Sequence, residues 1–354
     1  MHFYTLWYPN NPILKKYSEN YCQQLYSIVK DIFPQQSFKE ISDYLIIPDI
    51  AVTIEWYKNR KILEKDAKIF LQDQWSIYAT WNKEYLFSSQ GSIIAWTDIC
   101  LTLQDANPDR NYNNHPDHEK DIMGLGFGNI PIKKWQHLYA ESFALLHDIS
   151  PWFLSEISGM ISKIIPFGIS SSSHNSASYS SCIGHLYMSY PIDIEMPELA
   201  VLEAIIHESN HNKLNLIMKS DPLILNTREE VYYSPYRPDA RHIQGIYLWV
   251  HALVAVIYLF FHAHVSGIFT MNPSWLEKCM MYQMKNALSF RILQKYAILT
   301  PLGQKILEEM YEVHRETTEN IHSLHFENTL KSRSALKIKE HFQEVQKLYS
   351  NLRY

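Results

Sequence analysis

Apolar residues recur three and four positions apart over much of this chain, which is the spacing of amphipathic helices. The clearest repeat runs from Ile13 to Phe33 and ends at Pro34. From 44 to 56 the pattern fits either a short strand or the end of a buried helix. Helical spacing is also found at 62–78, 93–103, 135–165 with a break near Pro151, and 244–265. The remaining chain, 275–354, is expected to be helical as well, including 301–319 and a charged amphipathic end at 332–352. We therefore predict a mainly α-helical fold.

A few short strands are expected beside these helices. Residues 183–190 have strand propensity and follow a serine-rich run at 170–181. Such a run is usually a flexible linker. Because it leads directly into the strand, it is equally consistent with the wall of a pocket.

Residues 104–129 are polar and rich in turn-forming residues, which indicates a loop or a boundary. His115 and His118 lie there among acidic side chains, and a solvated loop is the preferred interpretation over a second metal site. We assign 1–130 to an N-terminal helical region, 131–270 to a metal-binding catalytic core and 271–354 to a C-terminal helical region. With 10 glycines and no linker, these regions are expected to pack as one compact unit.

Composition narrows the function classes. A hydrophobic fraction of 46% excludes general disorder. A net charge of −5 without a basic run argues against a nucleic-acid partner. The N-terminal residues lack the pattern of a signal peptide, so a cytoplasmic location is expected. The four cysteines are scattered without a CxxC pair, which agrees with a reducing compartment: Cys22, Cys100, Cys182 and Cys279.

The apolar stretch 245–261 is long enough to be weighed as a membrane span. It contains His251 and has no cluster of basic anchors, so a buried core helix is favoured and no membrane partner is expected. His147 also lies in an apolar stretch, where a hydrogen-bonded core histidine is expected.

The central motif is His207-Glu208-Ser209-Asn210-His211. Histidines four residues apart share one face of a helix and can bind one divalent metal. Pro197 and Glu198 suit the first turn of that helix. Its buried face is expected from Leu199, Leu202, Ile205 and Ile206.

Further donors follow downstream. His251, on the apolar helix, is the first choice for a third ligand and His242 the second. Arg237 and Arg241 are candidate clamps for a carboxylate, because guanidinium offers two parallel donors. The HExxH motif usually indicates a zinc peptidase with Glu208 as general base. Neither a metzincin continuation nor a glutamate-bearing third-ligand helix follows the motif.

A family resemblance covers about residues 170–265. The segments 174–179, 183–184, 203–214, 233–241 and 245–256 resemble the HExxH-motif peptide-modification proteins, which are regarded as iron- and 2-oxoglutarate-dependent peptide β-hydroxylases. The resemblance implies an Fe(II) site of His207, His211 and His251, with Arg237 or Arg241 pairing with the far carboxylate of 2-oxoglutarate. It leaves Glu208 to orient a ligand, bind the metal or position the substrate.

The sequence thus predicts a cytoplasmic dioxygenase that hydroxylates a peptide side chain at the β-carbon during peptide natural-product maturation. Its requirements would be Fe(II), 2-oxoglutarate, O2 and a peptide or precursor peptide. One alternative is a zinc metallopeptidase with Glu208 as base. The other is a non-catalytic metalloprotein that binds a peptide.

Overall fold

The computed structural model describes residues 12–45, 47–59, 62–88, 91–103, 125–170, 174–323 and 328–349. Helices dominate these residues, and the strands form one small mixed sheet, so the predicted mainly α fold with a few short strands is confirmed. His115, His118 and the N-terminal residues that bear on the cytoplasmic expectation lie outside the described residues.

The chain divides into two compact units, and each is described here by itself. The first unit ends at Ser220 and the second begins at Asp221. This boundary falls within the predicted catalytic core, 131–270.

The first unit begins with four helices, α1 (Pro12–Val29), α2 (Phe38–Leu45), α3 (Pro48–Lys58) and α4 (Glu64–Ser88). The open question at 44–56 is settled in favour of helix, with Pro48 in the first turn of α3. Helix α1 ends at Val29, earlier than predicted, because the chain turns there and buries Ile32 and Phe33.

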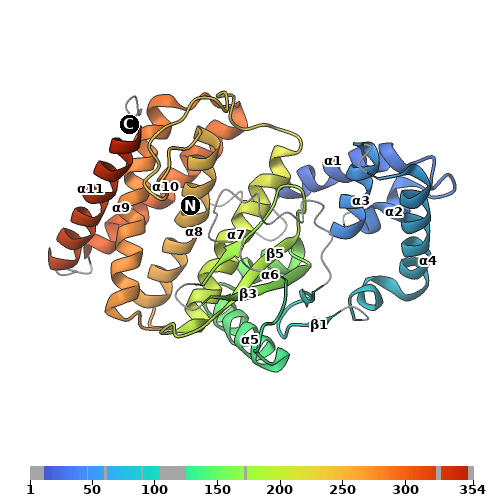
Figure 1. Cartoon of the computed structure of the whole chain (residues 1–354), viewed down its shortest axis with the longest axis horizontal. Helices are drawn as coiled ribbons and strands as arrows, with labels where there is room; N and C mark the ends of the chain where they lie inside the picture. Colours follow the sequence, from blue (N-terminus) through green and yellow to red (C-terminus); the bar gives the residue numbers. More distant parts are fainter. Residues whose placement is uncertain are drawn as a thin grey trace. The chain divides into compact units, whose positions relative to one another are not determined.

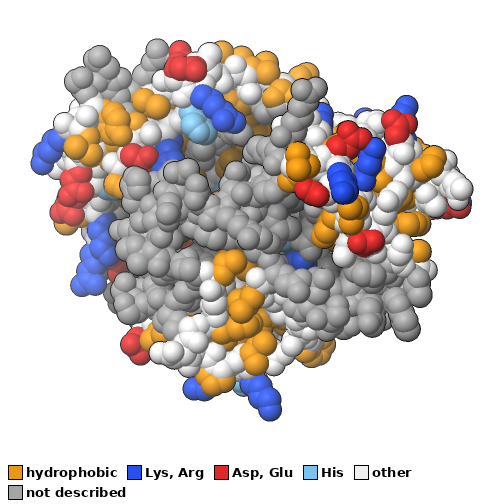
Figure 2. All heavy atoms as spheres, turned by 45° about the vertical axis from the view of Figure 1, so that its right-hand side comes forward, with side chains coloured by type: hydrophobic (Ala, Val, Ile, Leu, Met, Phe, Trp, Pro, Cys, Tyr) orange, Lys and Arg blue, Asp and Glu red, His pale blue; other side chains and the backbone are white. Residues whose placement is uncertain are grey.

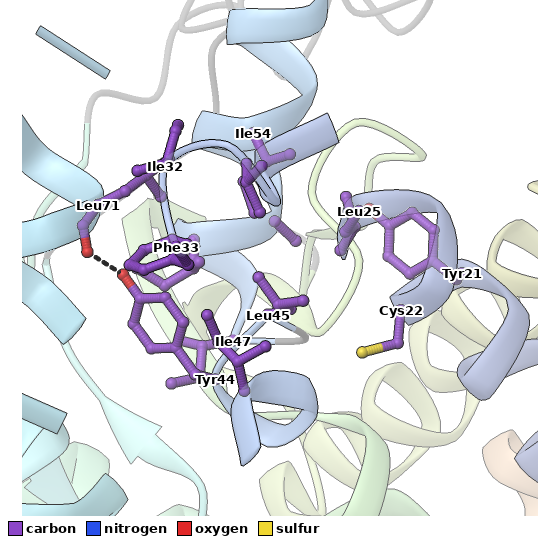
Figure 3. Packing of buried hydrophobic residues seen from close by; sticks show 14 of the residues in the cluster. Tyr21, Cys22, Leu25, Ile32, Phe33, Tyr44, Leu45, Ile47, Ile54 and Leu71 are labelled. Atoms are coloured by element: carbon purple, nitrogen blue, oxygen red, sulfur yellow. Dashed lines mark hydrogen bonds between the residues drawn. The ribbon is translucent and has the colours of Figure 1, made fainter. Parts of the chain in front are cut away.

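Aromatic and aliphatic side chains from these helices form one hydrophobic core (Figure 3). Tyr44 is fully buried in this core, and its hydroxyl donates a hydrogen bond of 2.5 Å to the carbonyl oxygen of Leu71. Phe33 packs edge-on against Tyr44. The hydrogen bond to Leu71 satisfies the one polar side-chain atom of Tyr44 within an apolar core.

Five strands of the first unit form a sheet with the order β1-β2-β3-β5-β4. Strand β3 pairs in parallel with β2 and β5, whereas the outer pairs are antiparallel. Strand β5 agrees with the strand propensity of 183–190. The strands are β1 (Ser92–Ile93), β2 (Cys100–Leu101), β3 (Lys163–Ser170), β4 (Ser176–Ala177) and β5 (His185–Pro191).

The helix predicted at 93–103 is wrong. The Ile94 N–H donates to the Ile99 carbonyl at 2.9 Å and closes a tight connection between β1 and β2. Trp96 within it has φ 73°, which a right-handed helix does not contain. The Cys100 N–H donates to the Ser162 carbonyl at 2.9 Å, so the sheet takes up the hydrogen bonds that a helix would have made internally.

The break near Pro151 is confirmed, because α5 (Ile132–Ile149) ends before α6 (Pro151–Met160) begins. The helical prediction up to residue 165 is wrong at its end, where β3 starts at Lys163 and pairs with β5. His147 is not a core histidine. Its side chain is 46% exposed at the end of α5, in ring contact with Trp96.

The second unit contains four long helices, α8 (Ile243–Val265), α9 (Pro273–Tyr296), α10 (Pro301–Ser323) and α11 (Asn328–Leu348), of which the last three lie within 271–354. They lie side by side (Figure 1), with α8 packed on α9 and α10, and α9 packed on α11. Among the described residues, α8 is the one helix long and apolar enough to cross a membrane, and 78% of that apolar window is buried. This burial is typical of a core helix.

The surface carries both charge signs. On the face shown in Figure 2, the described Lys and Arg side chains stand among Asp and Glu side chains and do not form one basic area. All four cysteines are buried.

Gly303 allows a close approach within the second unit. A Cβ added there would lie 2.2 Å from the carbonyl oxygen of Leu223, which is backbone and cannot rotate away. We expect Gly303→Ala to lower the free energy of unfolding by about 2 kcal/mol, measured by urea denaturation. Gly159→Ala is the control, since nothing lies within 4 Å of its added Cβ. An unchanged stability of Gly303→Ala would contradict this packing.

His314 on α10 makes the second unit sensitive to acid. Burial lowers the pKa of His314 to about 4, whereas a histidine in the unfolded chain titrates near 6.5. The unfolded state therefore binds more protons between these pH values, and stability falls as the pH drops through this window, by at most about 3 kcal/mol. We expect His314→Leu to lose this part of the pH dependence in denaturation curves recorded from pH 7 to pH 4. A parallel pH dependence in both proteins would contradict the assignment.

Candidate metal centre

The central motif lies on α7 (Pro197–Met218), which runs through the core of the first unit. Pro197 occupies the first turn as predicted. Helix α7 contacts α5, α1 and β5, so it is covered on several sides. The predicted buried face is confirmed, since these side chains have 0% exposure: Leu199, Leu202, Ile205 and Ile206.

The two histidines of the motif lie together. The ring centroids of His207 and His211 are 4.5 Å apart, and the rings are nearly perpendicular at 86°. His207 is buried and His211 is half-buried. Two imidazoles this close on adjacent turns are the arrangement that two ligands of one metal ion require.

Glu208 is buried beside them, and its carboxylate is held by two serine hydroxyls. Ser176 donates to Oε1 at 2.7 Å, and Ser178 donates to Oε2 at 2.6 Å. Ser176 belongs to β4, and Ser178 follows it. Residues 174–178 of the serine run thus line one side of the motif helix, and we call them the serine wall. Residues 171–173 lie outside the described residues.

His174 anchors the start of this wall to α7. Its Nδ1 lies 3.1 Å from the carbonyl oxygen of Ala200. Because a carbonyl only accepts, this contact places the imidazole proton on Nδ1. Residues 174–178 are therefore hydrogen-bonded to α7 at two positions, Ala200 and Glu208.

Asn212 ties α7 to the loop before β5. Its Oδ1 accepts from the Gly184 N–H at 2.7 Å, and its Nδ2 donates to the carbonyl oxygens of His185 and Glu208 at 3.3 and 3.1 Å. Cys182 Sγ, in the loop before β5, lies 2.9 Å from Nδ1 of His185, the first residue of β5. Sequence reasoning missed these positioning contacts, because no spacing rule connects residue 212 to residues 184 and 185.

A buried ion pair braces the same helix. Lys213 on α7 pairs with Glu156 on α6, and both side chains are almost fully buried. Burial raises the pKa of Glu156 and lowers that of Lys213, while each partner opposes the effect on the other. Lys213 also lies over the ring of Phe153, 5.6 Å from its centroid. The motif helix is thus fixed to α6 by a charge contact inside the core.

The second unit carries the candidate carboxylate clamps. Arg241 Nε lies 2.8 Å from Asp239 Oδ2, and a terminal nitrogen of Arg241 lies 3.2 Å from Oδ1. Arg237 Nε lies 3.7 Å from the same carboxylate. Burial and the neighbouring Arg241 lower the pKa of Arg237, and Asp239 opposes them. Two half-buried guanidinium groups thus share one carboxylate, which leaves the turn with a positive charge.

The two choices for a third ligand differ in their surroundings. His242 is the N-cap of α8, and its Nδ1 accepts from the Gly245 N–H at 3.1 Å. Burial, and then Arg228 and Arg241, lower the pKa of His242, which favours the neutral ring. In a neutral ring whose Nδ1 accepts, the proton resides on Nε2, so no lone pair remains for a metal. His251 lies on the buried face of α8 with 1% exposure and has no capping role.

The predicted residues therefore fall into two groups. His207, Glu208 and His211 lie together in the first unit, and Arg237, Arg241 and His251 belong to the second. Within the described part of the chain, no group of three or more His, Cys, Asp or Glu side chains is gathered as for a metal ion. No protein-family model and no curated protein matches the chain. The assignment of a function consequently rests on the residues themselves.

Removing one partner of the buried ion pair is expected to be costly. Lys213→Met leaves the Glu156 carboxyl buried without its cation, and should lower the free energy of unfolding by about 3 kcal/mol. The double variant Lys213→Met/Glu156→Leu removes both charges and should recover most of that loss. Urea denaturation of the wild type, Lys213→Met, Glu156→Leu and the double variant measures the coupling between the two side chains. Additive losses would show that the pair does not act as a unit.

Proposed function

We propose that this protein is an Fe(II)- and 2-oxoglutarate-dependent hydroxylase that acts on the β-carbon of a peptide side chain. The observation that carries the proposal is the paired rings of His207 and His211 on a buried helix, with the carboxylate of Glu208 turned to two serines. When bound, the iron site supplies oxidation by O2, in which one oxygen atom enters the substrate C–H bond and the other enters succinate as CO2 is released.

The donor chemistry fits such a metal. Neutral imidazole is a ligand for iron(II) as well as for zinc, and an oxygenase needs few protein ligands so that positions stay open. Helix α7 offers two imidazoles from one face. Following the family resemblance, we propose His251 as the third ligand and Arg237 or Arg241 as the partner of the far carboxylate of 2-oxoglutarate. The capping role of His242 supports the choice of His251.

The surroundings of Glu208 favour an oxygenase over a zinc peptidase. A general base must direct a carboxylate oxygen at the water whose proton it takes. In this protein both oxygens of Glu208 accept hydrogen bonds from serine hydroxyls. That arrangement favours a Glu208 side chain that is held in one position over a Glu208 that acts as general base.

The rest of the proposal follows from the same chemistry. The substrate is a peptide or precursor peptide that gains a hydroxyl group and is not cut, as in peptide natural-product maturation. The mixed surface charge seen on one face supports no nucleic-acid partner, and the burial of α8 supports a protein that does not span a membrane. We propose a cytoplasmic location.

The first experiment is anaerobic titration of the metal-free protein with Fe(II), followed by 2-oxoglutarate, with visible absorption as the readout. We expect a metal-to-ligand charge-transfer band that appears with 2-oxoglutarate and is lost in His207→Ala, because one of two adjacent imidazole ligands is missing. His147→Ala is the matched control, since His147 is an exposed histidine of the same unit. Stoichiometric zinc binding without any band, together with cleavage of peptides, would favour the metallopeptidase.

The same titration tests the third ligand. His251→Ala should lose the band, whereas His242→Ala should keep it and lose only part of the stability of α8, because an N-cap contributes about 1 kcal/mol. The reverse result, with the band kept in His251→Ala and lost in His242→Ala, would exchange the two assignments.

A further inference from the structure

We propose that Ser176 and Ser178 are positioning residues that hold Glu208 out of the coordination sphere of the metal and so keep positions open for the co-substrate. This inference rests on the proposed function. It assigns a purpose to the serine wall, whose hydroxyls meet the HExxH glutamate from a different part of the chain. In this proposal Glu208 is not a metal ligand, and its position matters because it must stay away from the metal.

The need for such a device follows from coordination chemistry. Iron(II) oxygenases use a small set of protein ligands, because the co-substrate chelates the metal and O2 needs a further position. Glu208 is the neighbour of His207 in sequence, and its carboxylate is a good ligand for iron(II). If it were free to turn, it would compete with 2-oxoglutarate for the metal.

The serine contacts are suited to prevent that turn. Each carboxylate oxygen has its own hydroxyl donor, at 2.7 and 2.6 Å, so rotation of the carboxylate would break both hydrogen bonds. Hydrogen bonds to a charged acceptor are the stronger kind. A carboxylate held at both oxygens is therefore a poor competitor for a metal.

The donors themselves are held by the sheet. Ser176 pairs with Met188 of β5 and Ala177 pairs with Tyr187. The Asn175 N–H donates to Ser189 Oγ at 2.8 Å, and the Ser189 N–H donates to the Asn175 carbonyl at 2.9 Å. The hydroxyl of Ser176 thus projects from backbone that is fixed by strand pairing, and Ser178 follows directly after the paired residues.

The test compares wild type, Ser176→Ala/Ser178→Ala, and the same double variant with Glu208→Gln added. Cobalt(II) binding and its visible spectrum report the ligands of the metal without any co-substrate. The charge-transfer band with Fe(II) reports the affinity for 2-oxoglutarate. Ser189→Ala serves as the control, because it removes another buried hydroxyl that holds the same segment without touching Glu208.

In the double serine variant, we expect the released carboxylate to join the metal. The cobalt spectrum should change, the metal should bind on the order of tenfold more tightly, and 2-oxoglutarate should bind on the order of tenfold more weakly, each a shift typical of one charged interaction. Adding Glu208→Gln should restore the wild-type cobalt spectrum and 2-oxoglutarate affinity, because an amide is a poor ligand in place of the carboxylate. A purely structural role of the serines would not produce this rescue.

Two results would overturn the inference. One is a cobalt spectrum that does not change in the double serine variant. The other is a joint loss of metal and 2-oxoglutarate binding that Glu208→Gln does not restore. Failure of the proposed function is distinguishable, because there the wild-type protein itself shows no charge-transfer band with Fe(II) and 2-oxoglutarate.

Discussion

The first unit depends on one constraint: helix α7 is buried although it carries charged and amide side chains. Helix α7 places Glu208, Asn212 and Lys213 in an interior where an unsatisfied polar group is costly. Each therefore requires a partner from another element. The serine wall meets Glu208, the loop before β5 meets Asn212, and α6 provides Glu156 for Lys213.

These partners also explain the local architecture. Strand β4 is short, yet its pairing with β5 sets the position of Ser176 opposite α7. The loop before β5 is held to the backbone of α7 at Glu208 through Asn212. The groups that would give a metal site its geometry are thus the same groups that satisfy the buried polar atoms of α7.

In the second unit, charge and capping have comparable roles. Asp239 lies between Arg237 and Arg241, so the turn carries two cations on one anion. His242 begins α8 by accepting from Gly245, and its imidazole is thereby committed to the helix terminus. His251 lies in the interior of the same helix and is not a capping residue. Two histidines that look similar in the sequence thus differ in their place, one at the N-cap of α8 and the other on its buried face.

The sequence by itself determined the helical class, the helix that carries His207 and His211, its Pro197 start and its buried face. It could do so because helix periodicity, proline in the first turn and the i, i+4 spacing are local properties of the chain. The same local reasoning placed a helix at 93–103 and a core histidine at His147, and it left the serine run between two interpretations. Tertiary structure decided these points, because strand pairing to residues 162–164, the exposure of His147 and the bonds from Ser176 and Ser178 to Glu208 join residues far apart in the chain. Non-local pairing leaves no periodic signal in one sequence, which is why the partners of Glu208, Asn212 and Lys213 became visible only in the folded protein.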